Sequence, residues 1–275
     1  MPENSPKSVT DFLKEKKAAR DAELKHIALA EKKIQLFLEL AYEMSSLAEQ
    51  AIGKLNTALQ TSPITSLRQR VLVGLALKAY GAFECLQKDA KDKRGESAHH
   101  LKTIVETFIY MHWVINDATD LNAKLVCAEG YRGLVAYYRN NPDNDGPLDY
   151  AAEWQTMLDQ KIAGIEEHWK VFKEKNLGKL AEECSLTTHY QRIYRRACEA
   201  AHISDLSTYM PPSPSGFVST APAAISTLRA SISLYYGLEI ICDLLAAACE
   251  YLGLHAAEQI KQWRERIVAI NNLMP

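Results

Sequence analysis

The stretch that decides the fold is Ile104-Val-Glu-Thr-Phe-Ile-Tyr-Met-His-Trp-Val-Ile115, in which apolar side chains fall on nearly every face of an α-helix. A helix that is apolar all round is buried among other elements, because none of its faces is suited to water. We therefore predict a helix over about residues 95–118 at the centre of a helical bundle. Glu106, flanked by Val105 and Phe108, is expected to be a buried carboxylate.

Apolar residues recur at spacings of three and four on both sides of this stretch, and no alternation of period two is sustained. The pattern predicts an all-α protein, a multi-helix bundle with a long N-terminal helical arm. The helix after Pro63 is expected to turn Leu77 and Phe83 toward the core. Further helices are expected over residues 67–88, 121–138, 150–175, 187–203, 223–252 and 256–270, with a short piece around Leu180.

The N-terminal region is predicted to form one long helix, because no proline or glycine occurs between Pro6 and Gly53. Its first half, residues 12–33, is highly charged and is expected to be an exposed arm. From Ile34 onward the helix becomes amphipathic, so this part is expected to join the bundle.

Residues 204–222 contain four prolines, one glycine and repeated Ser and Thr. Because this composition cannot sustain a helix, we expect a long loop, and long loops in compact domains are often functional. The chain is therefore predicted to consist of an N-terminal helical arm with the first bundle helix, residues 1–62, and a helical bundle domain, residues 63–275.

The overall composition is that of a globular protein with a substantial core: 275 residues, 47% hydrophobic and 24% charged. A net charge of −2 excludes a global attraction to nucleic acid or to an anionic membrane. Binding of a polyanion such as RNA would therefore need a local basic patch.

The six cysteines include no C-x-x-C pair, which is typical of reduced thiols in a cytosolic protein. The polar N-terminus lacks an apolar signal core, and no stretch reaches 18 uncharged apolar residues. We expect a cytoplasmic protein with no membrane partner. Residues 225–254, the most apolar segment, are interrupted by charged residues and are expected to form a buried bundle helix.

Candidate catalytic side chains are most concentrated in the segment before the predicted loop, Tyr190-Gln-Arg-Ile-Tyr-Arg-Arg-Ala-Cys-Glu-Ala-Ala-His202. Arg195 and His202 are seven residues apart and share a helix face. A metal-independent ribonuclease needs such a pair, an imidazole to handle the 2′-hydroxyl and a cation to stabilise the charged phosphorane. The structural alternative is that Arg195 pairs with Glu199 one turn on, while the helix dipole favours His202 at the C-terminal end.

A di-metal site is a further alternative, because Glu-x-x-His is the ligand pattern of di-iron carboxylate bundles. The pattern occurs at Glu23/His26, Glu96/His99 and Glu199/His202. Such a core also needs two single inward glutamates, and Glu106 alone is a candidate. We therefore expect no cofactor and no metal ion.

Two segments together resemble a bacterial family of all-helical proteins known only as a domain of unknown function. They are Leu101-Lys-Thr-Ile-Val-Glu-Thr-Phe-Ile-Tyr-Met-His112 and Tyr194-Arg-Arg-Ala-Cys-Glu-Ala-Ala-His202, and the likeness covers roughly residues 65–252. The second segment also resembles the R-x(4-6)-H signature of the HEPN superfamily, which Arg195 or Arg196 would carry with His202.

HEPN proteins are helical bundles, commonly homodimers, and many are metal-independent endoribonucleases of toxin or antiviral-defence systems. The resemblance implies that His202 is the acid and base, that Arg195 and Arg196 contact the phosphate, and that Glu106 is an orienting carboxylate. It also implies RNA as the substrate and a homodimer in which the paired Arg/His motifs of two subunits form one cleft.

A non-catalytic helical scaffold is the alternative from another class of function. Such a scaffold would bind a protein partner through residues 12–33 or through residues 204–222.

Overall fold

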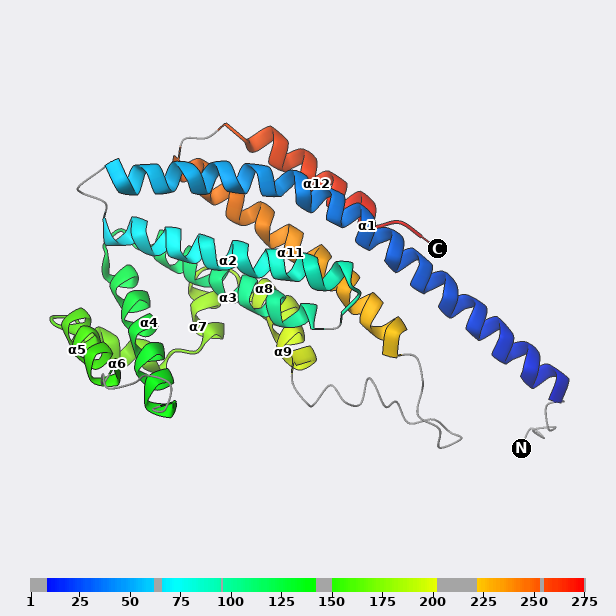
Figure 1. Cartoon of the computed structure of the whole chain (residues 1–275), viewed down its shortest axis with the longest axis horizontal. Coiled ribbons are helices and arrows are strands. Elements are labelled where there is room, and N and C mark those ends of the chain that lie inside the picture. The colour runs from blue at the N-terminus through cyan, green and yellow to red at the C-terminus, as the bar shows by residue number, and fades with distance from the viewer. Residues whose placement is uncertain are drawn as a thin grey trace.

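The computed structural model describes residues 9–61, 66–94, 96–141, 150–201, 222–252 and 255–274. Every regular element in these ranges is helical and none is a strand, which confirms the predicted all-α multi-helix bundle (Figure 1). The elements in chain order are α1 (Val9–Thr61), α2 (Leu67–Lys91), α3 (Ser97–Ile115), α4 (Leu121–Asn140), α5 (Tyr150–Ile162), α6 (Glu166–Glu174), α7 (Leu177–Glu183), α8 (Thr187–His189), the π-helical turn η2 (Tyr190–Tyr194), α9 (Arg195–Ala201), α11 (Pro222–Leu252) and α12 (Ala257–Asn271).

Helix α3 lies at the centre of the bundle, as its sequence predicts. It packs against α2, α11, α9 and α7, and side chains such as Ile104, Val105 and Phe108 are fully buried. Glu106 is half-buried, so the expectation of a fully buried carboxylate is wrong. It lies at the border between the core side of α3 and the solvent.

Helix α11 is the second core helix and contacts α1, α2, α3 and α12. Its residues Ala230, Leu234 and Leu238 are fully buried, as expected for a bundle helix. Within the described ranges one segment, Ser226–Cys249, is long and apolar enough to cross a membrane by length and composition. In the bundle, 56% of this apolar stretch is buried inside the protein.

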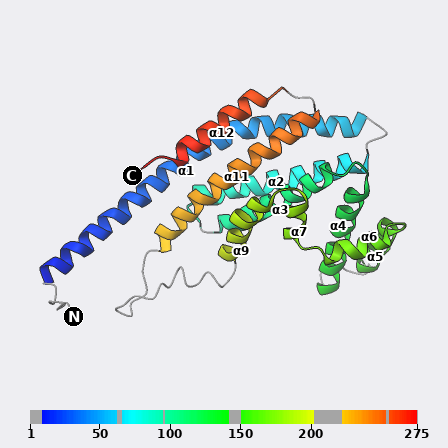
Figure 2. The ribbon, with the colours of Figure 1, turned by 180° about the vertical axis from the view of Figure 1, so that it is seen from behind.

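Helix α1 has two parts with different surroundings. From Lys14 to Ala28 its described side chains are exposed, apart from the half-buried Ile27, and Figures 1 and 2 show this end extending beyond the bundle. From Ala30 onward one stripe is buried, including Phe37, and packs on α11, α2 and α12. The exposed part thus ends before Ala30, earlier than the arm predicted over residues 12–33, and both parts belong to one continuous helix.

Two details of the fold differ from the sequence predictions. The helix predicted over residues 150–175 is broken by Gly164, whose φ of +79° lies in the left-handed region and separates α5 from α6. Leu77, predicted to face the core with Phe83, is 42% exposed, whereas Phe83 is fully buried. Of the predicted loop 204–222, only Pro222 lies within the described residues.

Candidate functional site

The helical segment that carries the sequence motif begins with a π-helical turn. Residues Tyr190–Tyr194 form this wider turn directly before α9, and such turns are frequent at functional sites. Ile193 and Ala197 are buried on the side that faces α3, which fixes the orientation of the segment. Arg192 and Arg196, four residues apart, are both exposed and therefore present their guanidinium groups on neighbouring turns.

A cavity of about 230 Å³ lies between this segment, the first turns of α3 and helix α11. Its polar lining consists of Arg192 and Arg196 on one side and Arg229, Ser233 and Tyr236 of α11 on the other. The apolar part of the lining includes Ala98 and Leu101 of α3. Three guanidinium groups from two helices thus meet at one cavity that has room for a phosphate group and part of a nucleotide.

The electrostatics of the cavity favour an anion. Among the residues that the structure describes, no carboxylate lines the cavity and none forms an ion pair with Arg192 or Arg196. Arg192 and Arg196 carry like charges on neighbouring turns and repel one another, and an anion between them relieves this repulsion. The planar guanidinium matches the oxygens of phosphate, so the arrangement suits a phosphate group.

The structure separates the site residues predicted from the sequence. Arg196 lines the cavity, whereas Arg195 does not and instead donates a hydrogen bond to Gln191 on its own helix at 3.2 Å. His202 lies outside the described residues, as does the side chain of Glu199, its alternative partner in the motif. Arg196 is therefore the predicted arginine that joins the other two cationic groups.

Glu106 does not line the cavity and lies in a different environment, among tyrosines. Burial raises the pKa of Tyr194, and the nearby Cys198 and Glu106 raise it further. Burial also raises the pKa of Tyr110 to about 12, again with a contribution from Glu106. The negative charge of Glu106 thus acts on these two phenols, and both stay protonated at neutral pH.

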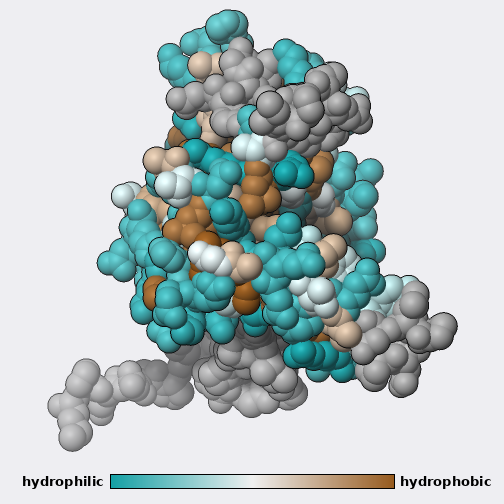
Figure 3. All heavy atoms as spheres, turned by 90° about the vertical axis from the view of Figure 1, so that its left-hand side faces the viewer, coloured by the Kyte–Doolittle hydropathy of each residue, from teal (hydrophilic) through white to brown (hydrophobic). Residues whose placement is uncertain are grey.

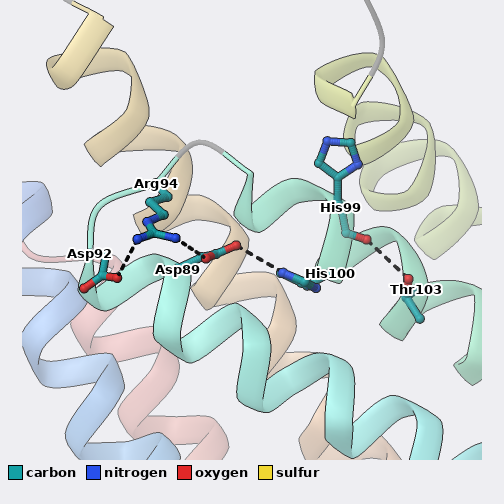
Figure 4. A network of polar contacts seen from close by, with 6 residues as sticks. All are labelled: Asp89, Asp92, Arg94, His99, His100 and Thr103. Atoms are coloured by element: carbon teal, nitrogen blue, oxygen red, sulfur yellow. Dashed lines mark hydrogen bonds and ion pairs between the residues drawn. The ribbon is translucent and has the colours of Figure 1, made fainter.

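The N-terminal end of α3, beside the cavity, is held by a polar network shown in Figure 4. The carboxylate of Asp89 on α2 contacts Nε2 of His100 at 3.1 Å and a guanidinium nitrogen of Arg94 at 4.0 Å. Arg94 also pairs with Asp92 at 3.4 Å. His99 points away from this network, so its side chain takes no part in it. Through Asp89 and His100, the network links the C-terminal end of α2 to the first turns of α3, which carry Ala98 and Leu101.

No metal-binding cluster occurs in the described part of the chain, since no three His, Cys, Asp or Glu side chains converge there. The Glu96/His99 pattern lies on the exposed start of α3, and Glu23/His26 lies on the arm of α1. Neither pair therefore meets the further carboxylates that a di-metal core needs.

A second hollow, of about 300 Å³, lies near the end of the molecule that carries α4, α5 and α6. Figure 3 shows this end as a mostly hydrophilic surface with small hydrophobic patches. The indole of Trp113 stacks on Phe172 with ring centroids 5.3 Å apart and donates to Glu183 at 2.9 Å, and Glu183 also accepts from Lys175 at 2.5 Å. Because these polar groups satisfy one another, we assign them a structural role.

Comparison with known proteins adds a family assignment. The model of a family of unknown function, DUF5677, matches residues 69–213, which is more than half of the chain. The chain belongs to the DUF5677 family. No curated protein and no solved structure matches it. The DUF5677 match agrees with the resemblance to a family of unknown function that the sequence motifs indicate. It covers residues 69–213, a shorter range than the expected 65–252.

The residue range of the DUF5677 match includes only some of the residues that line the cavity. It includes Arg192 and Arg196, whereas Arg229, Ser233 and Tyr236 come from α11, which begins beyond the matched range. Neither Arg192 nor any residue of α11 was predicted from the sequence to belong to the site. The spacing of four between Arg192 and Arg196 is a local signal that was available, but the contribution of α11 depends on the tertiary fold.

Proposed function

We propose that this DUF5677 protein binds RNA phosphates in the cavity between α9 and α11 and cleaves RNA as a metal-independent endoribonuclease of HEPN type. The observation that carries the proposal is that Arg192, Arg196 and Arg229 line one cavity with no carboxylate among its described lining residues. A phosphodiester gains negative charge as it becomes a phosphorane, so guanidinium groups fixed around it stabilise the transition state.

In this proposal Arg196 is the arginine of the R-x(4-6)-H motif, and His202 is its histidine. His202 takes the proton of the 2′-hydroxyl, because an imidazole has a pKa near neutrality. The 2′-oxygen attacks phosphorus, the bond to the 5′-oxygen breaks, and the protonated imidazole returns the proton to that oxygen. The products are a 2′,3′-cyclic phosphate and a 5′-hydroxyl end, and the reaction needs no metal ion.

In this proposal Arg195 and Glu106 take roles other than those that the resemblance implies. Arg195 is bonded to Gln191 and does not line the cavity, so it serves as a matched cation outside the proposed site. Glu106 does not line the cavity, so in this proposal it is a positioning group that acts through Tyr194 and Tyr110.

The test is incubation of total RNA with the purified protein in EDTA, followed by analysis of the new RNA ends. The wild type should produce 2′,3′-cyclic phosphates. Arg196→Ala and His202→Ala should reduce the cleavage rate by on the order of tenfold or more, because hydrogen bonds to charged groups contribute about 1.5–3 kcal/mol. Arg195→Ala, a change at an equally exposed position, should retain most of the activity. Intact RNA with the wild type, or equal losses in both arginine variants, would exclude the proposal.

One observation favours a second function, that of a non-catalytic interaction scaffold. The N-terminal end of α1 extends beyond the bundle, and from Lys14 to Ala28 its described side chains are exposed apart from the half-buried Ile27, as in a helix that binds another protein (Figure 2). For a scaffold, the RNA in the same incubation stays intact for the wild type and all variants. The scaffold and the nuclease therefore predict opposite results in a single experiment.

A further inference from the structure

A groove of about 910 Å³ runs between α1 and the C-terminal end of α2. Ile34 and Leu38 of α1 contribute apolar surface to it, and Tyr42 stands at its side with 81% of its surface exposed. Large aromatic side chains contribute strongly to interfaces when they are buried. An open groove with such a side chain is therefore suited to receive another helix.

The two walls of the groove carry opposite charges. Glu39 stands on the α1 wall, and Lys88 and Lys91 stand on the α2 wall. Other charges of the groove are already paired, Glu31 with Lys93 and Glu43 with Arg266. Among the described side chains, no ion pair forms with Glu39, Lys88 or Lys91. The groove thus offers one acidic and one basic contact to a helix that carries both signs.

The N-terminal arm of α1, from Lys14 to Ala28, has the complementary properties. Its exposed side chains include cations such as Arg20 and Lys25 and anions such as Glu23, and Leu24 exposes 54% of its surface. A helix that is polar and unsupported over this length is marginal in water, and packing against a partner stabilises it. Within the described part of the chain, the arm from Lys14 to Ala28 therefore has no surface to pack on, and no segment occupies the groove.

We infer that the groove receives the N-terminal arm of a second copy of this chain, and that the two copies exchange arms. Arm and groove lie on the same helix, so two α1 helices running antiparallel place each arm in the partner's groove. Such a contact is isologous, because the same pair of surfaces is used twice across a two-fold axis. Leu24 of each arm packs near the other copy's apolar groove residues, and the arm's charges face Glu39, Lys88 and Lys91. This inference does not depend on the ribonuclease proposal.

The test is sedimentation velocity of the full chain over a range of protein and salt concentrations. The wild type should form dimers that weaken as salt increases, because exposed ion pairs are screened. Leu24→Glu on the arm and Tyr42→Glu in the groove should each raise the dimer dissociation constant at least tenfold. Val171→Glu on α6 is the matched control, because Val171 is 57% exposed and lies on a helix outside the arm and groove; it should leave the constant unchanged.

A cysteine pair tests the partners directly. In a Cys85→Ser background, which removes the exposed native thiol, Leu24→Cys and Tyr42→Cys chains should form an intermolecular disulfide when mixed and much less when kept apart. A monomeric wild type would overturn the inference. A dimer that is equally stable in Leu24→Glu and Tyr42→Glu, with circular dichroism showing both folded, would also overturn it.

Discussion

Helix α11 packs closely on α2 at Gly237, and this contact gives a sharp test of the packing. A Cβ atom added at Gly237 would lie 2.4 Å from Cδ2 of Leu86 and 3.8 Å from the ring of Phe83. Both neighbours are fully buried, so a shift of the Leu86 side chain has to take place within the packed core. The residue before Gly237 is Tyr236, which lines the arginine cavity, so this contact also positions the α11 wall of the candidate site.

Two opposing effects set the magnitude for Gly237→Ala. Alanine is favoured over glycine in a helix interior by about 1 kcal/mol. An extra methyl group in a filled core costs about 1–3 kcal/mol, and the 2.4 Å contact requires a shift of Leu86. We therefore expect a net loss of about 1 kcal/mol in the free energy of unfolding. Gly74→Ala on α2, where nothing lies within 4 Å, should instead gain about 1 kcal/mol.

Urea unfolding followed by circular dichroism measures both changes as shifts of the midpoint at constant slope. In a Leu86→Ala background the space opens, so Gly237→Ala should become neutral or stabilising. The double-mutant cycle isolates this coupling. If Gly237→Ala raised the midpoint as much as Gly74→Ala does, the close contact between α11 and α2 would be refuted.

Three further predictions concern single groups. Ser66→Ala should lower the free energy of unfolding by about 1 kcal/mol, because Ser66 and Gln69 form a capping box at the start of α2; an unchanged urea midpoint would contradict this. Burial lowers the pKa of His112 below 6.5, so the unfolded chain binds a proton at this imidazole more readily than the folded chain does. The free energy of unfolding should therefore fall as the pH drops below about 6.5. His112→Gln should reduce this pH dependence in unfolding curves measured across the range. Burial favours a higher pKa for Glu183, but hydrogen bonds from neighbours including Trp113 hold the pKa below its ordinary value. Trp113→Phe should therefore raise the pKa of Glu183 in an NMR titration. A carboxyl resonance that titrates as in the wild type would argue against the hydrogen bond from Trp113 to Glu183.

Much of the fold follows from local patterns in the sequence. The segment Ile104–Ile115 predicts a central helix because it has no polar face, and α3 occupies that position. The break at Gly164 was not predicted, since a single glycine is tolerated within a helical pattern and only its left-handed backbone ends α5. Leu77 was misplaced because it lies six residues before Phe83, about 240° away around an ideal helix, and so faces the solvent.

The candidate site was predictable only in part. An ideal helix places Arg195 on the face of His202, which favoured Arg195 over Arg196. The structure instead has a π-helical turn before α9 and places Arg196 at the cavity, with Arg195 held by a residue of its own helix. Arg229 lies 33 residues beyond Arg196 on α11, and no local spacing connects the two. The role of His202 stays a prediction.

The central claim, that the arginine cavity binds RNA phosphate, is tested most directly by titrating labelled single-stranded RNA in EDTA at several salt concentrations. Arg196→Ala should weaken binding at least tenfold and make the dependence of log K on log salt less steep by about 0.7, the value expected for one lost phosphate contact on a single strand. Arg195→Ala should leave both quantities close to those of the wild type. Equal affinity and equal salt dependence in Arg196→Ala and the wild type would contradict the claim.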